Sequence, residues 1–452
     1  MIKRNILELP LIKIGLTSRW PQLIGRGTAL AVFILVIISG LFGTPVGNRN
    51  LSIVLIWIAW WAALILILVP FLGRSWCSIC PLPLPGEWIQ QGSVLGLLPG
   101  KKGIGRNWKW PKKMRNIWLQ NGSFAMMALF SAVILTKPAV TAWLLLGMIA
   151  VAIVMSVVFE RRAFCRYLCP VGGFIGLYSL ISPVELRIID QDVCRDHQIK
   201  TCYTGNENGY GCPWNVYPGA LQLNTNCGAC FECLRTCPHD NIAINIRDWG
   251  SDLSKAGAIK LDESFKAILM LGSATVYSAV MLGPWGNLKS AAFSIGTGPW
   301  WIFAGLFLVI NFLILPSLFF LAVKITQLRS SSGRSLKYAF KAFSAGMIPL
   351  GLGAWAAFSL SFVFTNGSYL WGVMSDPMGV GWNLLGTAGA NWTPYLSSFT
   401  PILVIAALVL GLIGAGQTAI RISSKDQKLG KPWPILLFSF VITVGLLWLL
   451  VG

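Results

Sequence analysis

Long apolar runs recur along the 452-residue chain and alternate with shorter polar segments. A run of about 20 apolar residues can cross the ~30 Å hydrocarbon layer of a bilayer as a helix. The pattern predicts nine transmembrane helices, at residues 27–46, 51–72, 117–136, 139–159, 267–286, 298–323, 343–365, 397–420 and 433–451. Pro70, Pro316 and Pro349 fall inside these runs, where proline is tolerated and can kink the helix. The sequence therefore predicts an all-α polytopic membrane protein.

The pattern changes between the fourth and fifth runs. Residues 160–266 contain two short stretches of alternating apolar residues, Val184–Ile189 and Asn241–Ile246, which predict strands. These strands flank a cysteine-rich segment, so we expect 160–266 to form an inserted two-cluster ferredoxin-like α+β domain. The other predicted parts are a basic N-terminal segment lying along the membrane surface (1–26), a first transmembrane hairpin (27–72), a basic cytoplasmic loop (73–116), a second hairpin (117–159) and a C-terminal membrane domain of about five helices (267–452).

Composition and charge agree with a membrane protein. The chain is 55% hydrophobic and only 12% charged, which excludes a soluble domain of this size. Its net charge of +20 reflects membrane topology rather than binding of nucleic acid. Of its 36 Lys and Arg residues, 33 fall in the polar segments predicted to lie on the same side of the membrane as the N-terminus. Only Arg49, Lys137 and Lys289 fall on the opposite side. We therefore predict a multi-pass protein of a bacterial or archaeal cytoplasmic membrane, with the N-terminus and the cysteine-rich domain in the cytoplasm.

The strongest motif is Cys227-Gly-Ala-Cys230-Phe-Glu-Cys233-Leu-Arg-Thr-Cys237-Pro238. Three closely spaced cysteines followed by Cys-Pro are typical of 4Fe–4S binding, and the Cys-Pro thiolate usually ligates a second cluster. A zinc site is disfavoured because zinc prefers two separated Cys-x-x-Cys pairs. We expect the cluster to be carried by thiols on the cytoplasmic side, where they stay reduced.

Three further cysteines, Cys194, Cys202 and Cys212, precede this motif, and Cys212 is followed by Pro213. The crossing rule groups Cys212 with Cys227, Cys230 and Cys233 on one 4Fe–4S cluster, and Cys237 with Cys194 and Cys202 on a second. The second cluster then lacks one ligand. His197, an aspartate such as Asp192 or Asp196, or a distant cysteine could supply it, although a hydrogen-bonding role is also open for His197. His239 is expected to cover or tune a cluster.

The remaining four cysteines form an internal repeat at the ends of two predicted helices. One copy reads Gly73-Arg-Ser-Trp-Cys77-Ser-Ile-Cys80-Pro81, and the other reads Arg161-Arg-Ala-Phe-Cys165-Arg-Tyr-Leu-Cys169-Pro170. If the two hairpins pack with pseudo-twofold symmetry, four thiols converge and suit a third cluster or another soft-metal site. Arg74, Arg161, Arg162 and Arg166 would favour the thiolate state. Redox-active thiol pairs and a purely structural role are the alternatives.

These motifs together resemble the NapH/NosR-type transmembrane ferredoxins and the related CcoG-type accessory proteins. The resemblance covers roughly residues 27–250 and implies quinol-linked electron transfer through 4Fe–4S clusters. The chain departs from that pattern in three places: Cys77-x-x-Cys80 is one residue shorter, the upstream cluster motif is stretched, and residues 267–452 are additional.

The favoured function is a membrane-integral electron-transfer subunit between the quinone pool and a respiratory redox partner. A quinone site needs a proton acceptor and a hydrogen-bonding group beside an apolar groove, and Glu87, Glu160 and Asn311 are candidates. Glu160 could instead be a surface partner of Arg161 or Arg162. The alternatives are a redox accessory factor that keeps a partner's metal or thiols reduced, and a membrane anchor for a larger respiratory complex.

Other features limit the chemistry. The only histidines, His197 and His239, lie outside the predicted helices, so no haem is expected within the bilayer. The chain has no evident phosphate-binding loop or hydrolytic triad, so we do not expect it to catalyse a complete reaction alone.

Residues 366–396 form an outer loop rich in Gly, Trp and Tyr with one charge, Asp376. This loop is either an interfacial aromatic belt or a docking face for a partner subunit.

Overall fold

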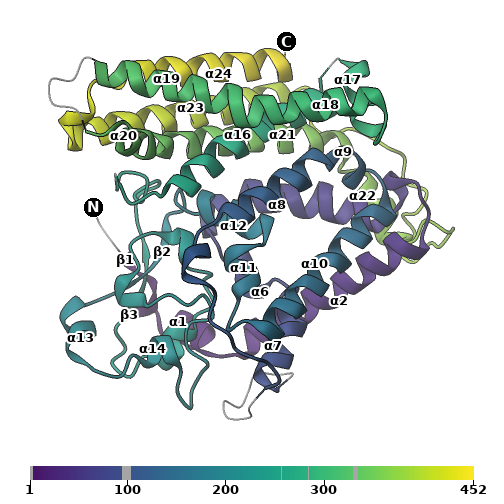
Figure 1. The fold of residues 1–452 in the computed structure, drawn as a ribbon. Helices are drawn as coiled ribbons and strands as arrows, with labels where there is room; N and C mark the ends of the chain where they lie inside the picture. The colour runs from purple at the N-terminus through teal and green to yellow at the C-terminus, as the bar shows by residue number, and fades with distance from the viewer. Residues whose placement is uncertain (1–3, 94–102, 256, 284, 329–333, 452) are drawn as a thin grey trace. The chain divides into compact units, whose positions relative to one another are not determined.

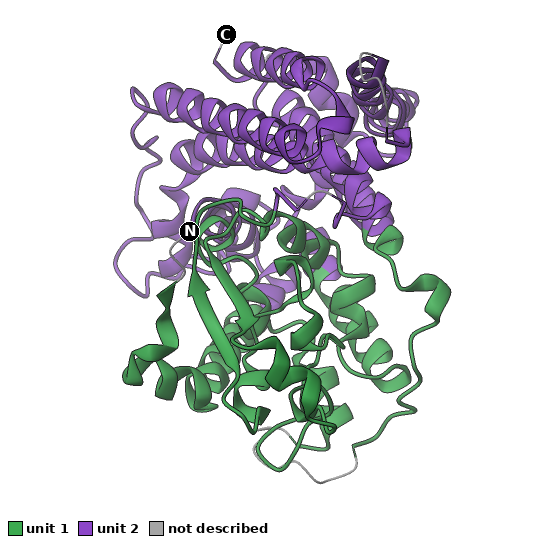
Figure 2. Cartoon of the chain, turned by 90° about the vertical axis from the view of Figure 1, so that its left-hand side faces the viewer, with its two compact units in different colours: residues 1–35, 68–120, 145–252 green, residues 36–67, 121–144, 253–452 purple. Residues whose placement is uncertain are grey.

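The computed structural model describes residues 4–93, 103–255, 257–283, 285–328 and 334–451. Parts of the predicted segments 1–26, 73–116, 267–286 and 324–342 therefore lie outside the described residues. The chain divides into two compact units (Figure 2). Unit 1 comprises Met1–Leu35, Leu68–Gln120 and Leu145–Asp252, and unit 2 comprises Val36–Ile67, Asn121–Leu144 and Leu253–Gly452.

In the described ranges, eight helices are long and apolar enough to cross a membrane. They are α2 (Trp20–Phe42), the Leu51–Leu72 helix, α10 (Pro138–Val158), α16 (Leu261–Met281), the Gly298–Leu328 helix, the Leu336–Asn366 helix, α23 (Thr400–Lys425) and α24 (Trp433–Val451) (Figure 1). Each matches one of the nine predicted runs. The remaining run, 117–136, forms α8 (Trp118–Leu129) and α9 (Ser131–Ile134) instead, because Phe130 between them leaves helical geometry, with φ −93° and ψ 9°.

Two of the long helices contain wider, π-type turns just before a proline. The Leu51–Leu72 helix consists of α3 (Leu51–Ile53), η3 (Val54–Trp60), α4 (Trp61–Ala63), η4 (Leu64–Leu68) and α5 (Val69–Leu72), and Pro70 follows η4. In the Gly298–Leu328 helix, η8 (Ile310–Ile314) lies between α18 (Gly298–Val309) and α19 (Leu315–Leu328), and Pro316 follows it. Proline lacks the N–H of a normal helix turn, and a local change of winding accommodates it.

Unit 1 contains a three-stranded antiparallel sheet with strand order β1-β3-β2 (Figure 1). The two predicted strands form β2 (Val184–Ile188) and β3 (Ile242–Ile246), and they pair from Val184 opposite Ile246 to Ile188 opposite Ile242. The third strand, β1 (Arg4–Asn5), comes from the basic N-terminal segment, so that segment belongs to unit 1. One face of the sheet packs in a small core with two cysteines, made of Leu7, Leu186, Cys202, Cys233, Leu234, Ile242 and Ile244.

The remaining elements of unit 1 are short. The α-helices are α1 (Pro10–Thr17), α6 (Trp76–Ile79), α7 (Leu84–Gln91), α11 (Ala163–Tyr167), α12 (Pro170–Tyr178), α13 (Gln191–Asp196), α14 (Thr201–Thr204) and α15 (Glu232–Thr236). The 3-10 turns are η1 (Ile6–Glu8), η5 (Lys112–Met114), η6 (Pro218–Ala220) and η7 (Asn224–Asn226).

A buried ion network fixes the chain that leads into the strong cysteine motif. Arg247 of unit 1 donates to Glu185 at 2.7 Å and to Asp252 at 2.6 Å. Asp252 also accepts the backbone N–H of Asn224 at 2.9 Å, and Arg187 donates to the Asn224 side chain at 3.0 Å. These contacts hold η7, the turn directly before Cys227, against the sheet.

Unit 2 is a helical bundle in which α16, α23 and α24 pack around α21 (Met347–Asn366). A Cβ atom on Gly353 would lie 2.9 Å from the Cα atom of Gly411, so glycine at both positions lets α21 and α23 approach closely. Trp355 donates to the Met270 carbonyl at 2.9 Å and contacts the ring of Trp61. The other elements are η2 (Gly47–Arg49), α17 (Gly286–Phe293), α20 (Leu336–Phe343), η9 (Ser344–Gly346), α22 (Tyr369–Ser375) and η10 (Gln427–Leu429).

The predicted outer loop contains α22 and a turn closed by its one charge. The Asp376 carboxylate accepts the backbone N–H groups of Val380 at 3.1 Å and Gly381 at 2.7 Å. Trp371, Trp382 and other large apolar side chains of this loop are exposed. Both interpretations of the loop, an aromatic belt and a docking face, stay predictions.

Candidate metal centres

The structure brings the four cysteines of the internal repeat together, and we call them the helix-end set: Cys77, Cys80, Cys165 and Cys169. The first cysteine of each copy lies in a short helix, α6 or α11, and the second directly precedes a proline, Pro81 or Pro170. Cys80, Cys165 and Cys169 each lie close enough to other members of the set for the charges of those members to affect their titration. The Cys169 sulfur also accepts the N–H of Gly172 at 3.2 Å. The two copies of the repeat therefore meet at one point, as the sequence predicts.

The environment of the helix-end set disfavours free thiolates. Burial raises the pKa of Cys169 to about 11, and Cys77 raises it further, while backbone N–H groups and Arg74 oppose the change. Burial and the neighbouring thiols also raise the pKa values of Cys80 and Cys165. The arginines therefore do not by themselves keep the thiols of Cys80, Cys165 and Cys169 ionised. A metal centre would supply the positive charge that deprotonates such thiols.

A second group, the cavity set, consists of Cys212, Cys227, Cys230 and Cys233. All four line one small, mostly apolar cavity together with Leu186 and Trp214. Burial raises the pKa of Cys230 to about 12, and the neighbouring Cys212 raises it further. This grouping is the one that the Cys-Pro rule predicts for the first cluster.

The remaining cysteines, Cys194, Cys202 and Cys237, form the three-thiol set. Burial raises the pKa of Cys202 to about 11, and Cys237 and Cys194 are the next causes. Asn241 donates its side-chain amide to the Cys194 sulfur at 3.3 Å and its backbone N–H to the Cys237 sulfur at 3.4 Å. Cys202 also interacts with Cys212 and Cys233, so this set adjoins the cavity set.

The donor chemistry of the cavity set fits an iron–sulfur cluster, because four sulfur atoms and apolar walls line one small cavity. Among the described residues, no three His, Cys, Asp or Glu side chains lie close enough together to hold a single metal ion.

Trp214 closes the cavity set and depends on a glycine. A Cβ atom on Gly228 would lie 1.8 Å from the indole nitrogen of Trp214. The Gly228→Ala variant is therefore expected to displace Trp214 at a cost of about 1–3 kcal/mol and to lower the cluster content at this set. Visible absorbance and iron content per protein measure the effect.

Two matched variants control this prediction. Gly15→Ala adds the same methyl group in α1, where nothing lies within 4 Å, and should retain the iron. A second change, Trp214→Leu, in the Gly228→Ala background should restore part of the lost iron, because it removes the ring that the methyl group strikes. Full iron content in Gly228→Ala would show that Trp214 does not wall the site.

Arg74 and Trp214 connect the helix-end set to the cavity set. The Arg74 guanidinium lies 4.0 Å from the centre of the Trp214 ring and donates to the Thr225 carbonyl. It also passes beside Gly172 and Gly176 of α12, where a Cβ would lie 3.4 Å and 2.8 Å from its nitrogens. Because Gly172 is the residue that donates to Cys169, one guanidinium spans the space between the two sets.

The N-terminal segment also supports the strong cysteine motif, which the sequence did not reveal. Arg235 of that motif donates to the Thr17 carbonyl at 2.9 Å, to Gln22 at 3.1 Å and to Glu232 at 2.7 Å. It also donates to the Cys230 carbonyl at 3.4 Å. A single arginine thus ties α1 and the start of α2 to the cavity set. The only signal in the sequence is the basic residue within an otherwise cysteine-rich stretch.

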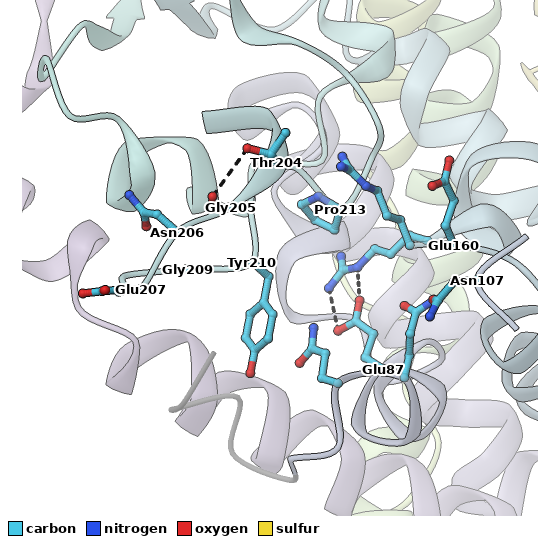
Figure 3. Close-up of a pocket in the computed structure, with 14 residues that line it drawn as sticks. Glu87, Asn107, Glu160, Thr204, Gly205, Asn206, Glu207, Gly209, Tyr210 and Pro213 are labelled. Carbon is cyan, nitrogen blue, oxygen red and sulfur yellow. Dashed lines mark hydrogen bonds and ion pairs between the residues drawn. The ribbon is translucent and has the colours of Figure 1, made fainter. Parts of the chain in front are cut away.

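Two of the three predicted quinone-site residues, Glu87 and Glu160, line the same pocket of about 630 Å³ (Figure 3). Glu87 forms a two-pronged ion pair with Arg162, drawn as dashed lines in Figure 3, and a further ion pair with Arg26 at 3.4 Å. Glu160 accepts a hydrogen bond from Asn215 at 3.1 Å. The partner of Arg162 is therefore Glu87, whereas Glu160 faces the pocket.

The third candidate, Asn311, lies in unit 2 and does not line this pocket. It sits in η8, and its amide nitrogen donates to the Phe307 carbonyl at 2.9 Å. Its side-chain oxygen lies against Gly272 of α16, where a Cβ would approach it to 2.5 Å. The structure accordingly does not unite Asn311 with the two glutamates.

Two backbone contacts join the pocket to two of the thiol sets. Arg162 donates to the Cys77 carbonyl at 2.9 Å, and Arg161 donates to the Cys212 carbonyl at 2.7 Å. Both arginines line the pocket. The helix-end set and the cavity set therefore each contact a guanidinium of the pocket wall.

Comparison with known proteins agrees with these groups. Residues 53–105 and 140–187 match the family described as 4Fe-4S binding domain, and these two stretches contain the helix-end set. The chain is 31% identical over 88 residues to YccM of Escherichia coli, which is named as an electron transport protein. It is 24% identical over 200 residues to MauN of Paracoccus denitrificans and 25% identical over 199 residues to MauN of Methylorubrum extorquens, both named as methylamine utilization ferredoxin-type proteins.

These matches show that the chain is similar to membrane-type 4Fe–4S ferredoxin proteins. The aligned regions cover 19% of this chain and 22% of YccM, and 41% of this chain and 56% and 55% of the two MauN proteins. The chain thus spans little more than half the length of these relatives at most. No solved structure matches the chain significantly.

Proposed function

We propose that the protein transports electrons across the thiol sets between the quinone pool and a respiratory redox partner. The 4Fe–4S binding domain and the electron transport and ferredoxin-type names of its relatives support this proposal. When bound, 4Fe–4S clusters would each supply a site that accepts and releases one electron. The helix-end set and the cavity set would hold two of them through Cys77, Cys80, Cys165 and Cys169 and through Cys212, Cys227, Cys230 and Cys233. The three-thiol set would hold a third.

The observation that carries the proposal is the pocket beside the first two sets. Its volume of about 630 Å³ lies in the usual range for sites of small organic ligands. The pocket wall includes Glu160 and Arg161, which come just after the end of α10 in the chain. Helix α10 is long and apolar enough to cross a membrane. A quinone ring entering here would meet charged groups that contact the backbone of both thiol sets.

The two glutamates of the pocket have different roles in this proposal. Burial alone would raise the pKa of Glu87, but the guanidiniums of Arg162 and Arg26 outweigh burial and lower it. A carboxylate held in this way is a poor proton acceptor and instead orients Arg162. The Glu160 carboxylate accepts a hydrogen bond from the neutral amide of Asn215 and can accept a proton from a bound hydroquinone. The charge bias of the loops supports a cytoplasmic position for this chemistry.

The test is anaerobic reduction of the purified protein by a quinol analogue, followed by electron paramagnetic resonance. We expect quinol to reduce the clusters of the wild-type protein and the Glu160→Gln variant to be reduced about 100-fold more slowly, since a lost general base typically costs that much. Glu207→Gln, which removes an exposed carboxylate from the same pocket, should leave the rate unchanged. Clusters that dithionite reduces but quinol does not would overturn the assignment of quinol as donor.

A further inference from the structure

The three-thiol set lacks a fourth sulfur ligand. The protein has 11 cysteines, all of which lie in the described ranges and are unbridged. Four form the helix-end set, at the ends of the two copies of the internal repeat, and four line the cavity of the cavity set. Only Cys194, Cys202 and Cys237 remain, so no distant cysteine is left to complete this group. If a cluster binds here, its fourth corner must be met by another kind of atom.

We propose that His197 closes this site through its Nε2 atom, which makes the third centre a cluster with three thiolates and one histidine. This inference rests on the proposed iron–sulfur function. It concerns only the ligand set of one centre, and it does not depend on quinone as the electron donor.

The carboxylates that the sequence offered as ligands are engaged elsewhere. Asp192 and Asp196 are both exposed, and both pair with Arg195, at 3.1 Å and 3.3 Å. Asp190 caps α13 by accepting the backbone N–H of Asp192 at 2.8 Å. Asp240, near the other end of the set, pairs with Lys13 at 3.1 Å. The nearby acidic side chains therefore have structural or surface roles and are not the favoured fourth ligand.

His197 is held in the state that a metal ligand needs. It ends α13 three residues after Cys194, and its Nδ1 lies 2.6 Å from the Val193 carbonyl oxygen. A carbonyl can only accept, so Nδ1 is the donor in this contact, and in the neutral imidazole Nε2 then has the lone pair that a metal ligand needs. Histidine ligands of metals commonly donate their other ring N–H to a backbone carbonyl in this manner, which fixes the tautomer and the ring orientation.

The ring of His197 also reaches the opposite end of the set. Its centre lies 4.9 Å from the centre of the His239 ring, and His239 follows Cys237 by two residues. The chain around Cys194 and the chain around Cys237 therefore meet at the two imidazoles. His239 is exposed and His197 is partly buried, which makes His197 the better-fixed ligand and His239 its cover.

A histidine ligand has a measurable electronic consequence. Neutral imidazole replaces an anionic thiolate, and such a replacement raises the reduction potential of an iron–sulfur centre. The hydrogen bonds from Asn241 to Cys194 and Cys237 act in the same direction, because they stabilise negative charge on sulfur. The three-thiol centre is therefore expected to have the highest potential of the three.

The experiment is pulsed electron paramagnetic resonance of the full-length, anaerobically purified protein poised at a series of potentials. The wild-type protein should show hyperfine coupling to one directly bound nitrogen at a single centre. His197→Ala should abolish that coupling and convert this centre to a 3Fe–4S signal. His197→Cys should restore a 4Fe–4S signal without nitrogen coupling and at a lower midpoint potential. Asp196→Ala, a change at the neighbouring exposed residue, should leave the coupling intact.

The outcomes separate this inference from the proposed function. Nitrogen coupling that survives in His197→Ala and disappears in His239→Ala would overturn the assignment of His197. An intact third cluster with no bound nitrogen in the wild-type protein would overturn histidine ligation altogether. Nitrogen coupling in a protein whose clusters quinol cannot reduce would leave the ligand assignment standing and refute the quinone function alone.

Discussion

Replacing Cys77 and Cys165 together with serine is expected to remove one whole iron–sulfur centre and to lower the iron content by about a third, if each of the three sets holds one cluster. Each substitution removes a thiol from a different copy of the repeat, so neither copy keeps its pair. The other two sets draw no ligand from these helices and should keep their iron. Iron and protein determination, with electron paramagnetic resonance of the reduced protein, measures the loss.

Ser78→Ala is the matched control for this double variant. Ser78 adjoins Cys77 in α6, and its hydroxyl donates to the Ser75 carbonyl at 2.7 Å. Its loss should leave all centres intact. Unchanged iron content in the double serine variant would instead favour the alternatives for the helix-end cysteines, namely redox-active thiol pairs or a structural role.

Much of the fold could be predicted because apolar runs and short alternating stretches are local signals. Residues 51–72 and 433–451 form helices with the predicted bounds, and β2 and β3 form where alternation predicts strands. No comparable local signal predicts β1, which has two residues and forms through its pairing with β3. Helix starts were also predicted too late: α2 begins at Trp20 and α16 at Leu261.

Because the predicted start of α16 is too late, the sequence does not predict that Lys266 is buried within this helix. The predicted helix 267–286 leaves Lys266 just outside its start. In the structure Lys266 lies inside α16 and is fully buried, with its amine 3.9 Å from the centre of the Phe124 ring. A lysine at the edge of an apolar run looks like a loop residue in sequence. Its burial depends on residues of α8 that lie far away along the chain, so no local pattern could reveal it.

The candidate site, like the fold, could be predicted where a local motif exists and not where it depends on residues far apart in the chain. The Cys-Pro rule predicted the grouping of the cavity set and of the three-thiol set, because it encodes how ligands are exchanged between neighbouring clusters. The contacts between the sets were not predictable. Arg74 and Trp214 are separated by 140 positions, and Glu87 and Arg162 by 75, so only the folded chain shows that they are partners. The sequence identified Glu87 as a candidate proton acceptor, and its two arginine partners favour a positioning role instead.

Glu87→Leu is expected to destabilise unit 1 by about 3–5 kcal/mol, because it leaves buried Arg162 without its counter-ion. The Arg162 side chain is only 2% exposed, and Arg26 would lose its carboxylate as well. Adding Arg162→Met to Glu87→Leu should recover part of the loss, since the more deeply buried of the two arginine charges is then removed and only Arg26 lacks its carboxylate. Anaerobic denaturation followed by tryptophan fluorescence and cluster absorbance measures both variants. Asp192→Ala, which breaks an exposed ion pair with Arg195, should cost less than about 1 kcal/mol.

The same ion pair predicts a pH dependence with a defined sign. Because the pKa of folded Glu87 lies below its ordinary value of 4.5, the ionised carboxylate contributes its full stabilisation above that value. The contribution is lost as the pH falls below 4.5 and through the lowered pKa of the folded state. Wild-type stability should therefore fall more steeply than that of the Glu87→Leu, Arg162→Met double variant in this acid range, and the two should run parallel from about pH 6 to 8. Parallel curves throughout would mean that Glu87 is not ion-paired in the folded protein, and Arg162 would then need another counter-ion beside Cys77.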